Sequence, residues 1–317
     1  MRVYRHYDEF ESEPVAAVVT VGNFDGVHLG HRRILAELLD AARRIEARSV
    51  LMTFEPHPTA VLNPKAAPAL LTTQAMKERL LKAAGVEALL VQPFDASFAS
   101  LLPEEFVEQV LIERIGAKAV IVGSDFVFGK DGKGDLGLLA EMGLRLGFDT
   151  LGVEPVAWTD RPISSTWIRD CLRQGDVETA ARLLDRPYEI EGAVEKGSGR
   201  GAGLGYPTAN LGGIQTMVPA SGIYAARVEI EGRTQPAVVY IGDRPTFADT
   251  RSIEVHLLGA SMSLYGLPLT VRFVSRIRED RKFDSPAALK AQIAVDIAAA
   301  RNILGPDAAR GFSHGQT

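Results

Sequence analysis

The chain changes its hydrophobic pattern once, near Arg186, and this change restricts it to two kinds of domain joined in series. Before this point, apolar strands alternate with segments of helical periodicity, which predicts a parallel sheet covered by helices. After it, helical spacing nearly disappears and short strands follow one another, which predicts a small antiparallel β-barrel with a C-terminal helix. The length of 317 residues fits two domains of ordinary size.

The first half contains the predicted α/β alternation. The run at 15–21 is apolar throughout, as in a strand buried on both faces. Further strands are expected at 50–54, 88–92, 119–122 and 150–156, and helices at 34–45, 73–84, 103–115, 135–146, 166–174 and 177–184. We therefore expect a Rossmann-like α/β domain over residues 1–185, with helices on both faces of its sheet.

The second half reads as strands until its last segment. Strands are expected at 188–194, 222–231, 235–241, 252–258 and 267–276, and in the last of these Thr270 and Arg272 alternate with apolar neighbours. Ser285 and Pro286 can start a helix, and Gly305 can end it. Its expected buried stripe is Leu289, Ile293, Ile297 and Leu304. We assign 186–306 to the barrel domain and 307–317 to a flexible tail.

Composition excludes several classes of protein. The formal net charge of −5, from 35 basic and 40 acidic residues, argues against a nucleic-acid binder. Cys171 is the only cysteine, so no disulfide can form within the chain, as is usual in a reducing compartment. The first ten residues are polar and no apolar run approaches the ~20 residues of a membrane span. We expect a cytoplasmic protein with small-molecule partners; the sequence does not indicate its oligomeric state.

The strongest motif lies between the first strand and the first helix. Residues 22–31 read Gly-Asn-Phe-Asp-Gly-Val-His-Leu-Gly-His. His28 and His31 are three residues apart at a helix start, so they share a face there, and a helix N-terminus attracts anions. Two imidazoles could stabilise the charge that develops when an α-phosphate is attacked and pyrophosphate leaves. The alternatives are a structural histidine pair or part of a zinc site, but no third ligand lies nearby.

A second cluster precedes and opens a later helix. Residues 161–169 read Arg-Pro-Ile-Ser-Ser-Thr-Trp-Ile-Arg, with three hydroxyls and two arginines around a helix N-terminus. Such a set suits phosphate oxygens. An N-cap alone would need one hydroxyl, so we favour a phosphate site over simple capping.

These two motifs resemble the nucleotidyltransferase superfamily with HxGH signatures. Residues 53–58 and 122–129 narrow the resemblance to the FMN adenylyltransferase module of bacterial bifunctional riboflavin kinase/FAD synthetases. The resemblance implies that His28 and His31 act on the ATP phosphates. It also implies an ATP site made of Gly22, Asn23, Phe24, Asp25, Asp125, Arg161, Ser164, Ser165, Thr166 and Arg169. Pro162 stands where the family often has arginine, which places Arg161 one position early.

A flavin ring bound to such a module would need an aromatic or apolar wall. The candidates are Phe54, Phe126 and Phe128, for each of which core packing is an equal alternative.

The second half carries its own motif. Glycine occurs at every second position from 197 to 205, as in a bare strand face, a flap over phosphates or a plain flexible loop. Tyr-Pro-Thr-Ala-Asn follows at 206–210, where Thr208 and Asn210 offer the oxygen ligands that Mg²⁺ prefers.

This region resembles the riboflavin kinase signature, in which a Gly-rich stretch leads into Pro-Thr-Ala-Asn. The resemblance implies that Glu254 is the base on the ribityl hydroxyl, and that Gly197, Gly199, Arg200, Gly201, Gly203 and Gly205 hold ATP phosphates. Glu254 shares a strand face with His256. Three departures from the family stand out: Ala202 in place of a basic residue, Tyr240 in place of asparagine, and 261–263 in place of an acidic turn.

The sequence thus predicts a bifunctional enzyme of flavin cofactor synthesis. Its C-terminal domain would phosphorylate riboflavin to FMN with Mg²⁺ and ATP, and its N-terminal domain would adenylylate FMN to FAD. The alternatives are a monofunctional FAD synthetase with an inactive flavin-binding barrel and a non-catalytic flavin or nucleotide sensor.

Overall fold

The structure is a computed structural model, and it describes residues 1–10, 16–196, 205–243, 251–259 and 264–305. The chain forms two compact units, Met1–Ser165 and Thr166–Thr317, which are described separately below. The first unit ends 20 residues before residue 185, where the sequence placed the domain boundary. The boundary at residue 185 stays a prediction.

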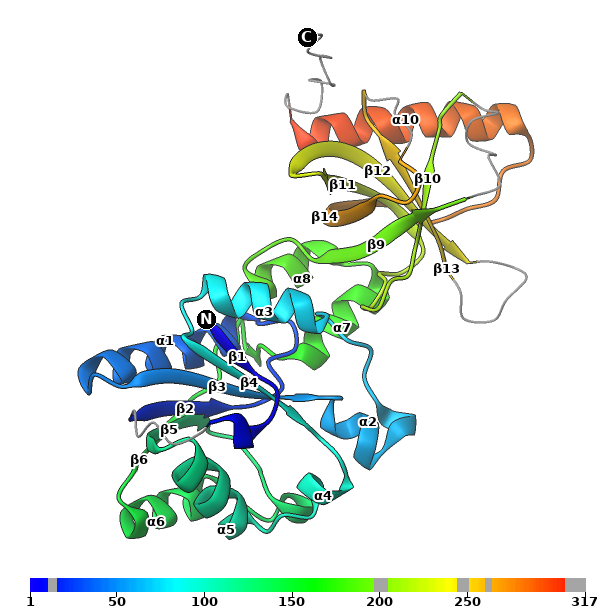
Figure 1. Cartoon of the computed structure of the whole chain (residues 1–317). Helices are drawn as coiled ribbons and strands as arrows, with labels where there is room; N and C mark the ends of the chain where they lie inside the picture. The colour runs from blue at the N-terminus through cyan, green and yellow to red at the C-terminus, as the bar shows by residue number, and fades with distance from the viewer. Residues whose placement is uncertain (11–15, 197–204, 244–250, 260–263, 306–317) are drawn as a thin grey trace. The chain divides into compact units, whose positions relative to one another are not determined.

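The first unit is built on a parallel sheet (Figure 1). In sheet order its strands are β1 (Arg2–Tyr4), β4 (Ala88–Pro93), β3 (Arg48–Glu55), β2 (Ala17–Val21), β5 (Ala117–Gly123) and β6 (Asp149–Val153), and all neighbouring pairs are parallel. All five residues of β2 are buried, as the apolar run predicted for a strand covered on both faces. β1 was not predicted, because it has only three residues and its strand conformation depends on pairing with β4, which is distant in the sequence.

Helices cover both faces of this sheet (Figure 1). α1 (Leu29–Arg44) and α3 (Gln74–Ala83) pack on one face, where Leu35, Leu38 and Leu81 join one apolar core. The π-helix η3 (Phe106–Arg114) and α6 (Leu136–Leu146) pack on the other, around Phe106 and Leu139. The remaining elements are short: η1 (Tyr7–Glu9), α2 (Pro58–Leu62), η2 (Pro64–Ala66), α4 (Ala96–Ala99), α5 (Pro103–Glu105), η4 (Lys130–Gly132), β7 (Ala157–Trp158) and β8 (Arg161–Pro162). The predicted Rossmann-like α/β class is confirmed.

The second unit contains a closed antiparallel barrel (Figure 1). In barrel order its strands are β10 (Ala209–Gly212), β13 (Arg251–Leu257), β12 (Arg233–Asp243), β11 (Gly222–Ile230), β14 (Pro268–Arg278) and β9 (Glu189–Glu195), and β9 pairs back to β10. Glu231 and Gly232 join β11 to β12 with φ values of 49° and 76°, as a two-residue hairpin turn requires. β10 was missed by the sequence reasoning, because it is short and offers no clear alternation.

Among the described residues of the second unit, three helices accompany the barrel. α7 (Ser165–Gln174) starts at the last residue of the first unit and precedes α8 (Val177–Leu184). Glu178 of α8 accepts hydrogen bonds from the Ser275 hydroxyl and the Arg276 amide of β14. α10 (Pro286–Leu304), which begins at the N-cap Ser285 as predicted, lies along the outer face of the barrel.

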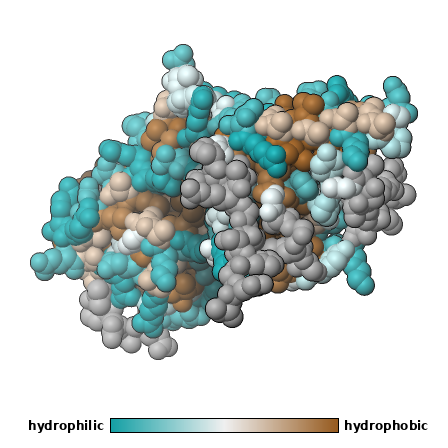
Figure 2. Space-filling model, turned by 90° about the horizontal axis from the view of Figure 1, so that it is seen from above, coloured by the Kyte–Doolittle hydropathy of each residue, from teal (hydrophilic) through white to brown (hydrophobic). Residues whose placement is uncertain are grey.

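α10 buries less of its predicted stripe than expected. Ile297 and Leu304 are buried against Ala225 and Leu258, whereas Leu289 and Ile293 are only half-buried and line a pocket. Its outer side carries the exposed Ala291, Ala294, Val295 and Ala298, and Figure 2 shows hydrophobic colours along this helix. No helix within the described part of the chain is long and apolar enough to cross a membrane.

Candidate functional sites

The loop between β2 and α1 has an unusual backbone. Phe24, Gly26 and Val27 all have positive φ, at 48°, 84° and 44°. Such values are rare for residues other than glycine and occur where the surrounding structure fixes the chain. Phe24 is 2% exposed, and its ring centroid lies 4.7 Å from that of His31. The buried Phe24 ring therefore packs against the histidine. The Gly22 amide donates to Met52 O at 3.0 Å and fixes the start of the loop to β3.

Asp25 fastens this loop to the segment before α3. Its buried carboxylate accepts hydrogen bonds from the amides of Leu71 and Thr72 and from the Thr72 hydroxyl, each at 3.0 Å. The Thr72 hydroxyl in turn accepts from the Gly26 amide at 3.1 Å. Asp25 was predicted to belong to the ATP site, and these contacts give it a positioning role in the loop.

His28 and His31 share a face at the start of α1, as their spacing predicted, and their rings stack on each other. Their ring centroids are 3.7 Å apart, and His28 Nδ1 caps α1 by accepting from the His31 amide at 3.3 Å. Burial lowers the pKa of His31 well below 6.5, and the neighbouring His28 and Lys77 lower this pKa further. His31 is therefore neutral at pH 7, and its buried Nδ1 has no partner in the described structure.

Gly30 makes room for this arrangement. A Cβ at this position would lie 3.1 Å from the ring of His28 and 3.5 Å from Ile163 O. Any larger residue would therefore displace the histidine that caps α1. The glycine of the His-Leu-Gly-His segment is thus explained by packing against the ring of His28.

The predicted second phosphate segment reaches the loop through one serine. Ser165 Oγ donates to Asp25 O at 2.8 Å. Ser164 is half-buried, and Arg161 in β8 is exposed. Thr166 and Arg169 follow in the first turns of α7, where Arg169 is buried. Their approach to ATP remains a prediction.

The aromatic candidates for a flavin wall differ in exposure. Phe54 is partly buried and packs edge-on against Phe94 at 5.5 Å. Phe126 is also partly buried and stacks on Phe128 at 5.4 Å, whereas Phe128 is 7% exposed within the core. Phe54 and Phe126 therefore have faces that a ligand can reach. Asp125, beside them after β5, is exposed.

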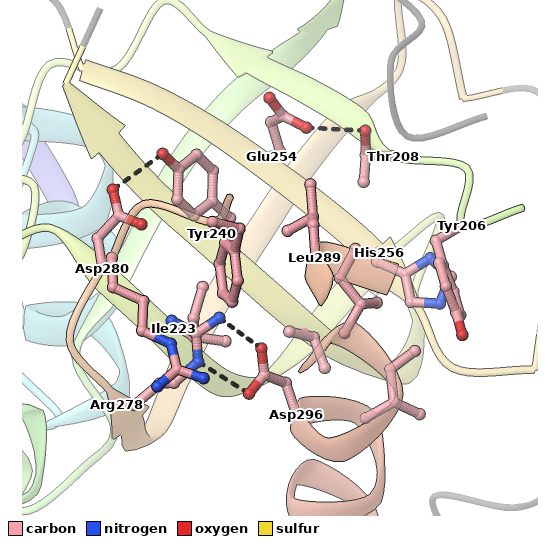
Figure 3. Close-up of a pocket in the computed structure, with 15 residues that line it drawn as sticks. Tyr206, Thr208, Ile223, Tyr240, Glu254, His256, Arg278, Asp280, Leu289 and Asp296 are labelled. Atoms are coloured by element: carbon pink, nitrogen blue, oxygen red, sulfur yellow. Dashed lines mark hydrogen bonds and ion pairs between the residues drawn. The ribbon is translucent and has the colours of Figure 1, made fainter. Parts of the chain in front are cut away.

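The barrel unit has a pocket of about 320 Å³ between its outer face and α10 (Figure 3). Its lining combines aromatic, aliphatic and charged side chains: Tyr206, Thr208, Ile223, Val238, Tyr240, Glu254, His256, Arg278, Asp280, Arg281, Phe283, Leu289, Ile293, Asp296 and Ile297. The predicted Thr208 and Glu254 thus lie in one pocket. The sequence also placed Glu254 on one face with His256, and both do line it.

Strand register places Tyr240 and Glu254 of this pocket in a row with one neighbour on either side. Ile223, Tyr240, Glu254 and Asn210 are consecutive cross-strand partners on β11, β12, β13 and β10. Thr208 Oγ1 donates to Glu254 Oε2 at 3.0 Å. Hydroxyl, amide and carboxylate oxygens thus lie near one another, which suits a hard cation such as Mg²⁺.

Tyr240 occupies the middle of this row. Its hydroxyl donates to Asp280 Oδ2 at 3.1 Å, which links β12 to the segment after β14 (Figure 3). The ring lies across Gly242, where a Cβ would collide with it. Tyr240 was noted in the sequence as a departure from the family, and the structure makes it a wall of the pocket.

A buried ion pair forms the floor near α10. Arg278 donates to both carboxylate oxygens of Asp296, at 2.9 and 2.8 Å, and Gln292 donates to the same carboxylate at 2.8 Å (Figure 3). The Arg278 guanidinium also lies 5.6 Å from the ring centre of Phe283. None of these side chains was predicted as a site residue. Their signal was only their charge at positions 278 and 296, because the pair forms through packing of α10 on the barrel.

The predicted glycine-rich phosphate site falls largely outside the described residues. This applies to Gly197, Gly199, Arg200, Gly201 and Gly203, and to the departures at Ala202 and 261–263. Gly205 is described, and its φ of +87° explains why glycine is needed there.

The fold and the two sites together define a class of enzyme. An α/β unit with paired imidazoles at a helix N-terminus is suited to nucleotidyl transfer. A barrel pocket with a carboxylate beside a hydroxyl and an amide is suited to activating an alcohol near a metal-bound phosphate.

Comparisons with known proteins give the same order of functions along the chain. The family described as FAD synthetase matches residues 10–167, and the family described as riboflavin kinase matches residues 184–304. A bifunctional riboflavin kinase/FMN adenylyltransferase from Pseudomonas fluorescens is 38% identical, covering 98% of this chain and 100% of that protein. Proteins with the same description are 39% identical in Escherichia coli K12, over 91% and 93% of the two chains, and 36% identical in Bacillus subtilis, over 90% and 92%.

A solved structure has the same fold over nearly its whole length. It is described as a macrolide-efflux protein from Streptococcus pneumoniae, and it matches with a TM-score of 0.88 and 33% identity over 95% of this chain and 99% of that chain. This chain belongs to the bifunctional riboflavin kinase/FMN adenylyltransferase family. The predicted family, fold and enzyme class are confirmed.

Proposed function

We propose that the chain converts riboflavin to FMN in its barrel unit and FMN to FAD in its α/β unit, using ATP for both steps. The observation that carries this proposal is the cluster of Glu254, its hydrogen-bond partner Thr208 and its cross-strand partner Asn210, beside a cavity of about 320 Å³ that Thr208 and Glu254 line. A cavity of this size with aromatic and aliphatic walls suits a ring system carrying a hydroxylated chain.

In the barrel, Glu254 would accept the proton of the terminal ribityl hydroxyl as that oxygen attacks the γ-phosphate of ATP and ADP leaves. A primary alcohol is a weak nucleophile, so a positioned carboxylate contributes strongly to the rate. Thr208 and Asn210 would hold Mg²⁺, which supplies neutralisation of phosphate charge. The Thr208–Glu254 hydrogen bond keeps the metal ligand and the base in contact.

In the α/β unit, the phosphate of FMN would attack the α-phosphate of ATP, with pyrophosphate leaving. No covalent enzyme intermediate is required, so catalysis rests on positioning and charge stabilisation. His28 and His31, held by Phe24 and Gly30 at the start of α1, would donate hydrogen bonds to the phosphate oxygens. Ser164, Ser165 and Thr166 would contribute further donors, and Phe54 and Phe126 an apolar wall for the flavin.

The test is chromatography of the products formed from riboflavin, ATP and Mg²⁺, with a parallel reaction started from FMN. FAD from both reactions supports the proposal. FAD from FMN alone would favour a monofunctional FAD synthetase, the alternative suggested by the departures from the family at Ala202, Tyr240 and 261–263. No product in either reaction from folded protein would favour a flavin or nucleotide sensor.

The Glu254→Gln variant tests the assigned base. We expect riboflavin phosphorylation to fall by about 10²- to 10⁴-fold, because general base catalysis is lost, while FMN adenylylation is unchanged. Glu231→Gln is the matched control, because Glu231 is an exposed glutamate in the β11–β12 turn of the same barrel. Wild-type phosphorylation by Glu254→Gln would remove Glu254 from the role of base.

A further inference from the structure

Lys77 is a charged residue in the buried stripe of α3. It is 6% exposed, and Leu81, one helical turn later on the same face, is fully buried. Burial of an ammonium ion is costly unless hydrogen bonds and opposite charges compensate it. The contacts of Lys77 are therefore informative about its purpose.

The ammonium group is the first member of a hydrogen-bond relay. Lys77 Nζ donates to Thr53 Oγ1 on β3 at 3.2 Å, and the Thr53 hydroxyl donates to Asn23 O at 3.1 Å. A threonine hydroxyl has a single hydrogen, so the direction of the relay is fixed. It ends on the backbone of the Gly22–His31 loop, which carries both histidines.

Lys77 also acts electrostatically on the groups that face it. Burial lowers its pKa, while Asp25 of the loop and Glu55 at the end of β3 oppose this change. The pKa of His31 on α1 is lowered chiefly by burial, then by His28, and then by the charge of Lys77. Because the His28 and His31 rings are stacked, protonating both would place two positive charges side by side, which is energetically unfavourable.

We propose that Lys77 is a positioning residue for adenylyl transfer, which holds the histidine loop through the Thr53 hydroxyl. A neutral imidazole donates one hydrogen bond and remains in the tautomer that its surroundings select. This inference rests on the proposed transfer reaction in the α/β unit. It assigns to α3 a part in a site otherwise built from the β2–α1 loop and the segment before α7.

The experiment measures FMN adenylylation against pH in the full chain for wild type, Lys77→Met, Thr53→Val and Lys82→Met. Lys82 is an exposed lysine on the same helix and serves as the matched control. We expect Lys77→Met to lower kcat roughly ten- to hundredfold, because a small misplacement of catalytic groups has effects of this size. Its acid limb should also move to higher pH, because His31 gains protons more readily without the neighbouring charge.

Thr53→Val separates the two effects. It removes the relay and leaves the charge, so kcat should fall without a shift of the acid limb, and Thr53→Ser should restore the rate. Riboflavin phosphorylation by the same samples should be unchanged, and circular dichroism with thermal unfolding reports that the α/β unit is folded. If Lys77→Met does not fold, Lys77→Gln takes its place. A folded Lys77→Gln variant with the acid limb of the wild type would count against the electrostatic effect of Lys77 on His31.

The outcomes distinguish this inference from the proposed function. Wild-type protein that makes no FAD from FMN refutes the transfer reaction itself. An active wild type, together with a Lys77→Met variant within twofold of its kcat and with a superimposable pH profile, refutes only the role of Lys77. An acid limb that moves to lower pH would also overturn the assigned electrostatic effect.

Discussion

Replacing Asp296 by asparagine tests whether the Arg278–Asp296 pair anchors α10 to the barrel. The Asp296 side chain is 4% exposed and that of Arg278 is 18% exposed. Removing one member of a buried pair generally costs about 3–5 kcal/mol, because the other charge is left uncompensated. Arg278 keeps some access to water, so we expect the lower end, about 3 kcal/mol.

Hydrogen–deuterium exchange of the full chain measures this change locally. An opening free energy lowered by about 3 kcal/mol corresponds to roughly 150-fold faster exchange of the protected amides of α10 and β14. The α/β unit serves as an internal reference and should not change. Asp284→Asn, an exposed carboxylate just before α10, is the matched control.

A double variant, Arg278→Met with Asp296→Leu, separates charge from shape. Replacing both charges by apolar groups removes the uncompensated arginine, so protection of α10 should recover relative to Asp296→Asn alone. The reasoning is refuted if Asp296→Asn changes the exchange of α10 by less than threefold. It is refuted equally if the double variant exchanges faster than the single one.

Two further predictions concern the two sites. Burial holds the pKa of His31 in the folded chain below its unfolded value of 6.5. Below pH 6.5 the unfolded chain therefore binds more protons than the folded chain, so the α/β unit should lose stability as the pH falls. Thermal unfolding at several pH values should show this loss in wild type and much less of it in His31→Gln; equal losses would contradict it. Tyr240→Asn should raise KM for riboflavin about tenfold, because the pocket loses an aromatic wall, and Tyr240→Phe should stay closer to wild type. Initial rates measure KM, and the same KM for all three proteins would contradict this prediction.

Much of the fold could be predicted because its signals are local. The continuous apolar run of β2 follows from burial of that strand on both faces. The alternation around Glu254 in β13 follows from burial of that strand on one face. β1 and β10 were missed because they are short and are defined by their pairing with strands far away in the sequence. The π-helical form of η3 was also missed, since the predicted helix at 103–115 has the same apolar positions in either form.

The candidate sites divide in the same way. That His28 and His31 share a face follows from helical spacing, and Thr208 and Glu254 were singled out by the family resemblance. The hydrogen bond between Thr208 and Glu254 is a finding of the structure. Lys77 and Asp280 could not be found in this way. Their partners are 24 and 40 residues distant, and only tertiary packing brings them together.

The pocket row has a consequence for how this chain can vary in length. Each of its four members sits on a different strand, and side chains alternate between the two faces of a strand. A single residue inserted within one of these strands would turn that strand's member of the row toward the barrel interior, so that Glu254 or its neighbour would leave the row. Evolution can therefore lengthen the connections of this barrel freely, but within β10–β13 it can add or remove residues only in pairs or through a bulge.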